Sequence, residues 1–444
     1  MTNVARTISR RDFLALGALA GAGTVLSACG SPTPQVALGP ALGDGYDGPP
    51  VTIEYWNGFT GGDGPAMRQL VEDFNNSQEL ITVRMNVVQW AQYYQRVIAA
   101  VHAGQGPDVG AMHVEQLATQ AARQAISPLD DVVAEFGLSQ DEYPAQVWEA
   151  GIYNGHRYGI PFDVHSLGSY TNLDLVEQAG LTATAATGEE FESNLQAMLD
   201  AGVATPFWMP NRWPAHLIFL SLLWQFGGEP YAADGSAATF DSDAGVQALT
   251  WMAEQVGKGF SPGNVAQDSQ YTAFKNGEGA VTWDGIWQIN DLASTAPDLR
   301  WSLAPLPTIG TEPAVWANSH HLVMFRTRRP DDDRLAATKT FVKYLVDNSD
   351  SWSAAGMIPA RSAARQSPEF TGSPQAALSD AIGTMRFLPP IAAVGEVQVQ
   401  TLETAVSNAV LGRDDPRSAL RAAADQATAI MEGNLRKFER GEAA

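Results

Sequence analysis

The sequence is poor in cysteine and in basic residues. Cys29 is the only cysteine among 444 residues, so no disulfide can form within the chain and no zinc site can be built from several thiolates. Lys and Arg number 27 against 49 Asp and Glu, which gives a formal net charge of −22. An acidic chain of this kind repels phosphate backbones, so nucleic acid is not expected as a partner.

Long apolar runs are also lacking. The stretch from Leu14 to Leu26 is shorter than the roughly 20 residues that a membrane-spanning helix needs. It follows Ser9-Arg10-Arg11-Asp12-Phe13, which resembles a twin-arginine export signal, and ends in Leu26-Ser27-Ala28-Cys29, which resembles a bacterial lipobox. We therefore expect residues 1–28 to be a signal peptide that is removed, Cys29 to carry a lipid that anchors the chain to the cell membrane, and residues 29–50 to be a flexible tether.

Two motifs of metalloprotease and nucleotide chemistry are absent as well. The sequence contains no His-Glu-x-x-His and no P-loop pattern. A glycoside hydrolase needs two carboxylates about 5 to 10 Å apart, and nothing in the sequence singles out a pair among Glu115, Asp163 and Asp284. We expect a binding protein without cofactor or metal, and a secreted glycoside hydrolase or lyase is the less favoured alternative.

Strand and helix signals alternate along the rest of the chain. The first strand is expected to deliver Trp56 into a glycine-rich loop at residues 57–64. This alternation predicts a mostly parallel α/β sheet, in which ligands lie outside the carboxyl ends of the strands. The expected strands are 51–55, 81–87, 109–112 and one near 314–325, and the expected helices include 90–103, 188–201, 215–226 and 243–257.

The chain is too long for a single core, so two domains are expected. Several motifs occur in order after the first glycine loop: Gly106-Pro107-Asp108-Val109, Tyr158-Gly159-Ile160-Pro161, Phe274 to Val281 with Asp284-Gly285-Ile286-Trp287, and Ile358-Pro359-Ala360-Arg361. Together they resemble the family 1 extracellular solute-binding proteins of ABC importers, the group that contains the maltodextrin-binding protein. The resemblance covers about residues 50 to 430.

This resemblance implies a periplasmic-binding-protein fold, with two α/β lobes joined by a hinge and the ligand in the cleft between them. Lobe 1 would comprise residues 51–162 and about 321–370, and lobe 2 residues 163–320 and about 371–444. The implied function is capture of a carbohydrate, a di- or oligosaccharide, outside the cytoplasmic membrane and delivery to the transmembrane subunits of an ABC permease. We expect the protein to act as a monomer.

Residues that could bind a sugar combine aromatic rings for its C–H face with polar groups for its hydroxyls. The resemblance implies that Trp287 stacks on a sugar ring, and it places His165 where relatives carry a sugar-binding acid. Core packing is the alternative for Trp287, a hinge hydrogen bond for His165, a helix N-cap for Asp63 and a structural role for Arg361. The full predicted set is Trp56, Phe59, Asp63, His113, Glu115, Asp163, His165, Trp208, Trp213, Trp283, Asp284, Trp287, Asn318, His320 and Arg361.

A polyol or a glycerol phosphodiester is the alternative ligand. A phosphate group would require Arg, Lys or helix N-termini in the cleft. The predicted site loops are short of basic residues, with Arg212 and Arg361 as the exceptions. The sequence therefore favours a neutral sugar and leaves the phosphodiester open.

Overall fold

The structure is a computed structural model that describes residues 38, 41–43, 45–181 and 185–439. The predicted signal peptide, the predicted lipid attachment at Cys29 and most of the predicted tether lie outside the described residues. Within the described part of the chain, no helix is long and apolar enough to cross a membrane.

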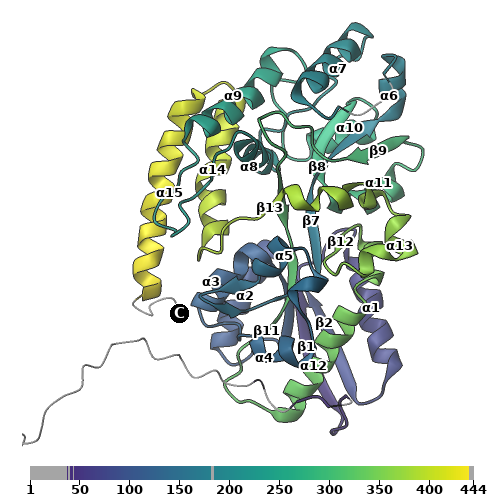
Figure 1. Ribbon diagram of the computed structural model, residues 1–444, viewed down its shortest axis with the longest axis vertical. Coiled ribbons are helices and arrows are strands. Elements are labelled where there is room, and N and C mark those ends of the chain that lie inside the picture. Colours follow the sequence, from purple (N-terminus) through teal and green to yellow (C-terminus); the bar gives the residue numbers. More distant parts are fainter. Residues whose placement is uncertain (1–37, 39–40, 44, 182–184, 440–444) are drawn as a thin grey trace, which may run out of the picture. The chain divides into compact units, whose positions relative to one another are not determined.

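The first sheet is mostly parallel and contains the predicted N-terminal strands (Figure 1). Its spatial order is β2 (Ile81–Val87), β1 (Val51–Asn57), β3 (Val109–His113), β11 (His320–Met324) and β6 (Ile160–Pro161). β1 is parallel to β2 and β3, whereas β11 is antiparallel to β3 and β6. β11 is buried along its whole length, as expected for a strand covered on both faces.

Helices cover both faces of this sheet. On one face the ring of Phe341 lies 5.4 Å from that of Tyr55 in β1. On the other face Tyr93 is fully buried in a cluster with Met112 of β3. The helices are α1 (Gly64–Ser77), α2 (Trp90–His102), α3 (Val114–Ala122), α4 (Asp130–Glu135), α5 (Ala145–Glu149) and α12 (Asp332–Asp347), with a short 3-10 helix η1 (Gln140–Glu142) and a hairpin of β4 (Ile152–Tyr153) and β5 (His156–Arg157).

The second sheet is built around β7 (Asp163–Asn172), whose ten residues are all buried. The first half of β7 pairs with β12 (Ile358–Pro359) and β10 (Val315–Asn318). Its second half pairs with β8 (Val281–Gly285) and β9 (Trp301–Ala304), and β13 (Met385–Arg386) pairs with β10. Nearly every other strand of this sheet therefore depends on β7 for its position.

The central helix of this second part is α8 (Ala215–Gln225), which is buried all round. The hydroxyl of Ser221 in α8 accepts a hydrogen bond from the backbone N–H of Trp316 in β10 at 2.8 Å, which ties the helix to the sheet. The other helices are α6 (Leu173–Gln178), α7 (Gly188–Asp200), α9 (Asp243–Gly257), α10 (Ser269–Lys275), α11 (Ile289–Thr295), α13 (Pro368–Thr371), α14 (Val394–Val410) and α15 (Pro416–Glu439), with 3-10 helices η2 (Ile286–Gln288), η3 (Ser351–Ala355), η4 (Ala364–Gln366) and η5 (Pro374–Thr384).

Two chain segments connect the sheets side by side. Phe162 separates β6 from β7, and its N–H donates to the carbonyl of His320 at 2.9 Å. Ser319 separates β10 from β11, and its hydroxyl donates to the carbonyl of Asp163 at 2.5 Å. The two α/β units predicted from the sequence are confirmed, while the exact lobe boundaries stay a prediction.

Two local expectations were wrong. The first strand was predicted too short, at 51–55, because Trp56 is still in β1 and pairs with Asn86 on one side and Gly110 on the other. The single strand expected near residues 314–325 is two strands that belong to different sheets. The break occurs at Ser319, whose N–H donates to the side chain of Asn318 at 2.8 Å.

Candidate functional site

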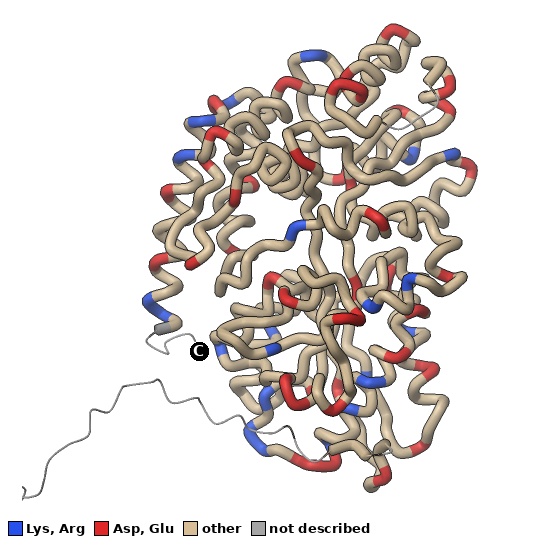
Figure 2. Tube along the Cα trace, viewed as in Figure 1, with Lys and Arg blue, Asp and Glu red and all other residues tan. Residues whose placement is uncertain are grey.

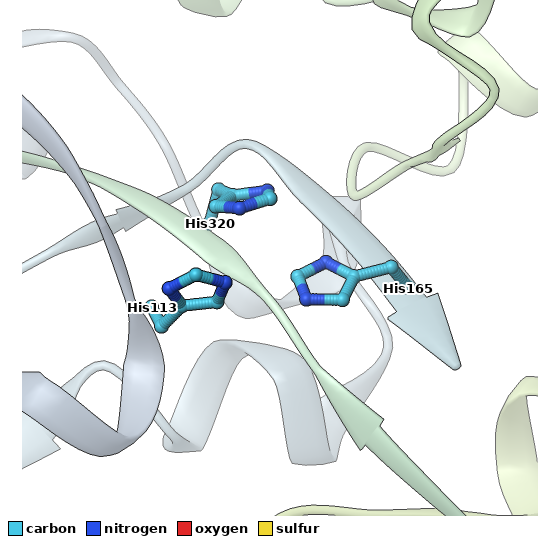
Figure 3. A group of neighbouring side chains, drawn as sticks. All are labelled: His113, His165 and His320. Carbon is cyan, nitrogen blue, oxygen red and sulfur yellow. The ribbon is translucent and has the colours of Figure 1, made fainter. Parts of the chain in front are cut away.

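Three histidines meet where the two sheets join. Strand register brings them there, because His320 lies opposite His113 in the first sheet and Asn318 lies opposite His165 in the second. The ring centroids of His113 and His165 lie 4.6 and 4.5 Å from that of His320. Figure 3 shows the three side chains converging from their separate strands. The structure thus gathers three predicted site residues that are far apart in the sequence.

Asp163 orients two of these rings. Its Oδ1 accepts from the N–H of His320 at 2.9 Å and lies 3.2 Å from Nδ1 of His165. Its Oδ2 lies 2.7 Å from Nδ1 of His320 and accepts from Nε1 of Trp352 at 2.7 Å. Burial alone would raise the pKa of Asp163, but the electrostatic effect of His320 and the hydrogen bonds from both histidines hold it well below its usual range. The carboxylate is therefore ionised.

Tyr94 orients the third ring. Its hydroxyl lies 2.6 Å from Nδ1 of His113 and accepts from the backbone N–H of His113 at 3.0 Å. Burial, with a smaller electrostatic effect from neighbouring His320, lowers the pKa of both His113 and His165. Both rings are consequently neutral near pH 7.

An aromatic surface adjoins the histidines on the first sheet. Half-buried Trp90 stacks on His320, with ring centroids 5.3 Å apart and planes 17° apart. Phe59 is 1% exposed and packs against both tryptophans, with its ring centroid 5.4 Å from that of Trp90 and 4.9 Å from that of Trp352. Gly58 permits the close approach, because a Cβ there would lie 2.0 Å from the Trp90 ring. Trp90 also stacks on Tyr94, with ring centroids 5.8 Å apart, and Phe59 serves as packing.

Two carboxylates lie near this surface. Asp63 occupies the N-cap position of α1 but forms no capping hydrogen bond, and its Oδ1 accepts from the N–H of Gly61 at 3.1 Å. Glu115 accepts from the side-chain amide of Asn318. Burial raises the pKa of both Asp63 and Glu115. Asn318 also accepts from the N–H of Val114 at 3.2 Å, so its amide joins β10 to α3.

The second sheet contributes tryptophans to the same region. Half-buried Trp287 lies 6.2 Å from His165 and 6.3 Å from Trp316, measured between ring centroids. Trp213, which is 36% exposed, lies 6.2 Å from Trp287 on its other side. A Cβ at Gly285 would lie 2.2 Å from the Trp287 ring, so glycine is needed there. A continuous series of rings thus runs from Trp213 to Trp90 through the histidines.

Other predicted residues of the second sheet lie away from this series. Trp283 is 1% exposed and stacks on Trp251 with centroids 5.5 Å apart and planes 9° apart. Asp284 is equally buried and accepts from the N–H of Gly285 at 2.7 Å and from Gln270 at 3.1 Å. Burial raises the pKa of Asp284 to about 6. These contacts describe core packing.

Three more predicted residues have structural partners. Nε1 of Trp208 donates to Thr205 at 3.1 Å. Arg361 forms a hydrogen-bonded ion pair with Glu142 at 2.5 Å and lies 3.7 Å from Asp347. Trp56 is held within β1, as described above. The ring contacts of the described residues do not bring any of the three to the histidines.

Sequence reasoning missed three residues of the site. They are Trp90, which begins the helix expected over residues 90–103, Tyr94 in the same helix, and Trp352. Trp90 could have been found, because it follows the carboxyl end of β2, where the α/β rule places ligands. Trp352 lies in a 3-10 helix far along the chain, and no local pattern signals its contact with Asp163.

Comparisons with known proteins support a common ancestry over most of the chain. The family model for bacterial extracellular solute-binding proteins matches residues 60–350. The diacetylchitobiose binding protein DasA of Streptomyces coelicolor is 23% identical over 386 residues, which cover 84% of this chain and 88% of DasA. The sn-glycerol-3-phosphate-binding periplasmic protein UgpB of Salmonella typhimurium is 28% identical over 155 residues, but these cover 33% of this chain and 35% of UgpB.

A solved structure shares the fold. The GacH receptor of Streptomyces glaucescens, described unliganded and in complex with acarbose, superimposes with a TM-score of 0.75. The match covers 86% of this chain and 98% of GacH, with 19% sequence identity. At this level of identity the likeness establishes the periplasmic-binding-protein fold.

Proposed function

The chain belongs to the family of bacterial extracellular solute-binding proteins, and from this premise we propose that it is the substrate-binding component of an ABC importer, with a di- or oligosaccharide as its solute. The observation that carries the proposal is the pair of half-buried tryptophans, Trp90 at the start of α2 and Trp287 in η2, that approach one polar cluster from two different helices. Trp90 lies 4.4 Å from His113, and Trp287 lies 6.2 Å from His165.

The chemistry of this region suits a carbohydrate. A sugar ring has an apolar C–H face and hydroxyls at its edge. Burying about 60 Å² of C–H face on a tryptophan contributes about 1.5 kcal/mol at 25 cal/mol per Å². The carboxyl groups of Asp63 and Glu115 and the neutral rings of His113 and His165 supply acceptors and donors for hydroxyls, each worth about 1 kcal/mol. Two stacking surfaces and several hydrogen bonds are sufficient for micromolar binding.

Relatives support the same class of solute. DasA is named for diacetylchitobiose, and GacH was solved with acarbose. UgpB, named for sn-glycerol-3-phosphate, matches over about a third of each chain. Arg361, one of the two basic residues considered for a phosphate, is already paired with Glu142 and Asp347. These observations favour a neutral sugar over a phosphodiester.

Delivery would follow the mode of the family. Binding of solute between two domains closes them in proteins of this architecture. The segments that connect the sheets, at Phe162 and Ser319, are the places where the backbone would bend. Small-angle scattering should give a smaller radius of gyration with saturating solute, and an unchanged radius would contradict closure.

We further propose that the mature chain is a monomer anchored by lipid on Cys29, after export through a twin-arginine signal. The support is the sequence Leu26-Ser27-Ala28-Cys29 behind Arg10-Arg11. Cys29→Ala should release the protein from the membrane fraction with its solute affinity unchanged. Membrane retention of this variant would contradict the anchor but leave the receptor function standing.

A screen for ligands tests the main proposal. The full chain is tested by thermal shift against oligosaccharides, polyols and glycerol phosphodiesters, because a solute at 100 times its Kd stabilises by about 2.7 kcal/mol. We expect a di- or oligosaccharide to bind, and calorimetry to confirm one site. Binding of a phosphodiester alone would favour the alternative ligand, and hydrolysis products from an oligosaccharide would contradict a receptor without enzymatic activity.

A further inference from the structure

The histidine cluster has features that binding a neutral solute does not require. One nitrogen atom from each of His113, His165 and His320 lies within 4.8 Å of the corresponding atoms of the other two. The three rings lie close together, each on a different strand (Figure 3). His320 is 2% exposed, and among the described residues no hydrogen-bond partner lies within reach of its Nε2. A buried polar atom without a partner destabilises the folded state unless something else occupies it.

The opposite nitrogen of each ring is already engaged. Nδ1 of His165 and Nδ1 of His320 contact the carboxylate of Asp163 at 3.2 and 2.7 Å. Nδ1 of His113 contacts the hydroxyl of Tyr94 at 2.6 Å. Histidines that bind metals through Nε2 are typically oriented in this way, by a carboxylate or another acceptor on Nδ1. The cluster therefore has both the inner ligands and the outer partners of a metal site.

We propose that His113, His165 and His320 bind one divalent transition-metal ion of the Zn²⁺ type through their Nε2 atoms. Asp163 and Tyr94 position the rings and do not contact the ion. Neutral imidazole is a preferred ligand for Zn²⁺, Cu²⁺ and Ni²⁺, whereas Ca²⁺ and Mg²⁺ prefer oxygen. A three-histidine set selects the first group.

The geometry is close to what such an ion needs. Zn–N bonds of 2.0–2.1 Å in a tetrahedral site separate the nitrogens by about 3.4 Å. One nitrogen of each ring, Nδ1 or Nε2, lies at most 4.8 Å from one nitrogen of each other ring, and a movement of less than about 1 Å brings nitrogens at this separation to the tetrahedral spacing. Side-chain rotation accommodates a movement of this size, and the backbone pairing of His320 with His113 stays in place.

A three-histidine site leaves one coordination position open. Trp90 and Trp287 flank the cluster, 4.4 Å from His113 and 6.2 Å from His165. An oxygen atom of a solute held between these tryptophans can occupy the open position. The proposal thus adds a metal to the same region, but it does not depend on the solute being a sugar.

Titration of Zn²⁺ into the full, chelator-treated chain tests the site. Calorimetry should give one Zn²⁺ per chain, and His113→Gln, His165→Gln and His320→Gln should each weaken binding at least tenfold. His321→Gln is the matched control, because His321 is buried in the same strand, next in sequence, yet outside the cluster. Its affinity for Zn²⁺ should equal that of the parent. Co²⁺ should give the visible absorption of a tetrahedral nitrogen site in the parent and in His321→Gln alone.

Tyr94→Phe provides a second variant should the histidine variants fail to fold, which circular dichroism would reveal. It removes only the hydroxyl that positions His113 and should weaken Zn²⁺ binding about 10- to 100-fold. Absence of Zn²⁺ binding in the parent, or parent-like binding in the folded variants, overturns the site. Solute titrations with chelator present distinguish the two proposals. If a sugar binds but Zn²⁺ does not, the receptor function stands and the metal site is wrong. If Zn²⁺ binds but no sugar does, the metal site stands and the proposed solute is wrong.

Discussion

Asp163 and Asp284 are both buried carboxylates of the second sheet, at 0% and 1% exposure, yet their environments move their pKa values in opposite directions. Asp163 receives a backbone N–H, an indole N–H and two imidazoles, and its pKa falls well below the usual range. Asp284 has amide partners, and its pKa rises to about 6. Burial alone therefore does not define a carboxylate's role; the number and charge of its partners do.

The tryptophans of these two regions differ in the same way. Trp283 lies against Trp251 in the core, whereas Trp287, just after the same strand, is half-buried and contacts His165. The region of Asp163 combines an ionised carboxylate, neutral histidines and half-buried tryptophans. The region of Asp284 packs in the core. Four substitutions test this difference between the two regions.

Asp163→Ala should have the largest effect. It leaves the indole N–H of Trp352 and the N–H of His320 buried without their acceptor. Breaking such a network typically destabilises by about 3 to 5 kcal/mol. Urea unfolding at pH 7 measures the change, and a loss below about 1 kcal/mol would show that Asp163 does not organise the region.

Asp284→Asn should act in the opposite direction. A pKa raised from 3.8 to about 6 means that the native protein binds the extra proton between these pH values, so the stability of the parent falls as pH rises from about 4 through 6 and is level above. At pH 7 the neutral side chain should stabilise by about 2 to 3 kcal/mol. Near pH 4 parent and variant should unfold alike. Equal stability at pH 7 would contradict the raised pKa.

Trp287→Ala should weaken every bound sugar by about 1.5 to 3 kcal/mol, because it removes a ring face that many sugars share. Trp301→Ala is the matched control, since Trp301 is also half-buried but packs against Tyr170 in the same sheet, 5.6 Å away. It should leave affinity unchanged. Calorimetric titration measures the sugar affinity of both variants. If folded Trp287→Ala binds sugars as tightly as the parent, Trp287 only packs in the fold and does not stack on the sugar.

His165→Ala should have the most selective effect. It deletes a directional hydrogen-bonding group, so an unpaired hydroxyl costs about 1 to 3 kcal/mol only for solutes that use it. Titration against a preferred sugar and its epimers should show unequal losses. Uniform losses across epimers would mean that His165 acts on the shape of the region and not on recognition of one hydroxyl.

Much of the fold could be predicted from the sequence. The period-two and helical patterns predicted β1, β2 and β3 and the helices α2, α7, α8 and α9, and β2 and α9 were predicted with their observed bounds. Errors arose where pairing overrides local pattern. Trp56 stays in β1 because strands on both sides pair with it, and the break at Ser319 depends on contacts with Asp163.

The candidate site was predictable as a list but not as an arrangement. The sequence singles out three histidines, several carboxylates and several tryptophans as candidates, but nothing local distinguishes Trp283 from Trp287 or Asp163 from Asp284. No metal was expected, because metal motifs are recognised by short spacing, and His113, His165 and His320 come from three separate strands.

Local periodicity and composition in the sequence are enough to predict the first strands and several helices, the acidic character of the chain and the ordered motifs of its family. Only the tertiary structure decided which side chains share a site. Strand register across two sheets brings His113, His165 and His320 together around Asp163, and burial separates Trp283 from Trp287. Register between strands distant in sequence is set by packing of the whole core, which no local pattern contains.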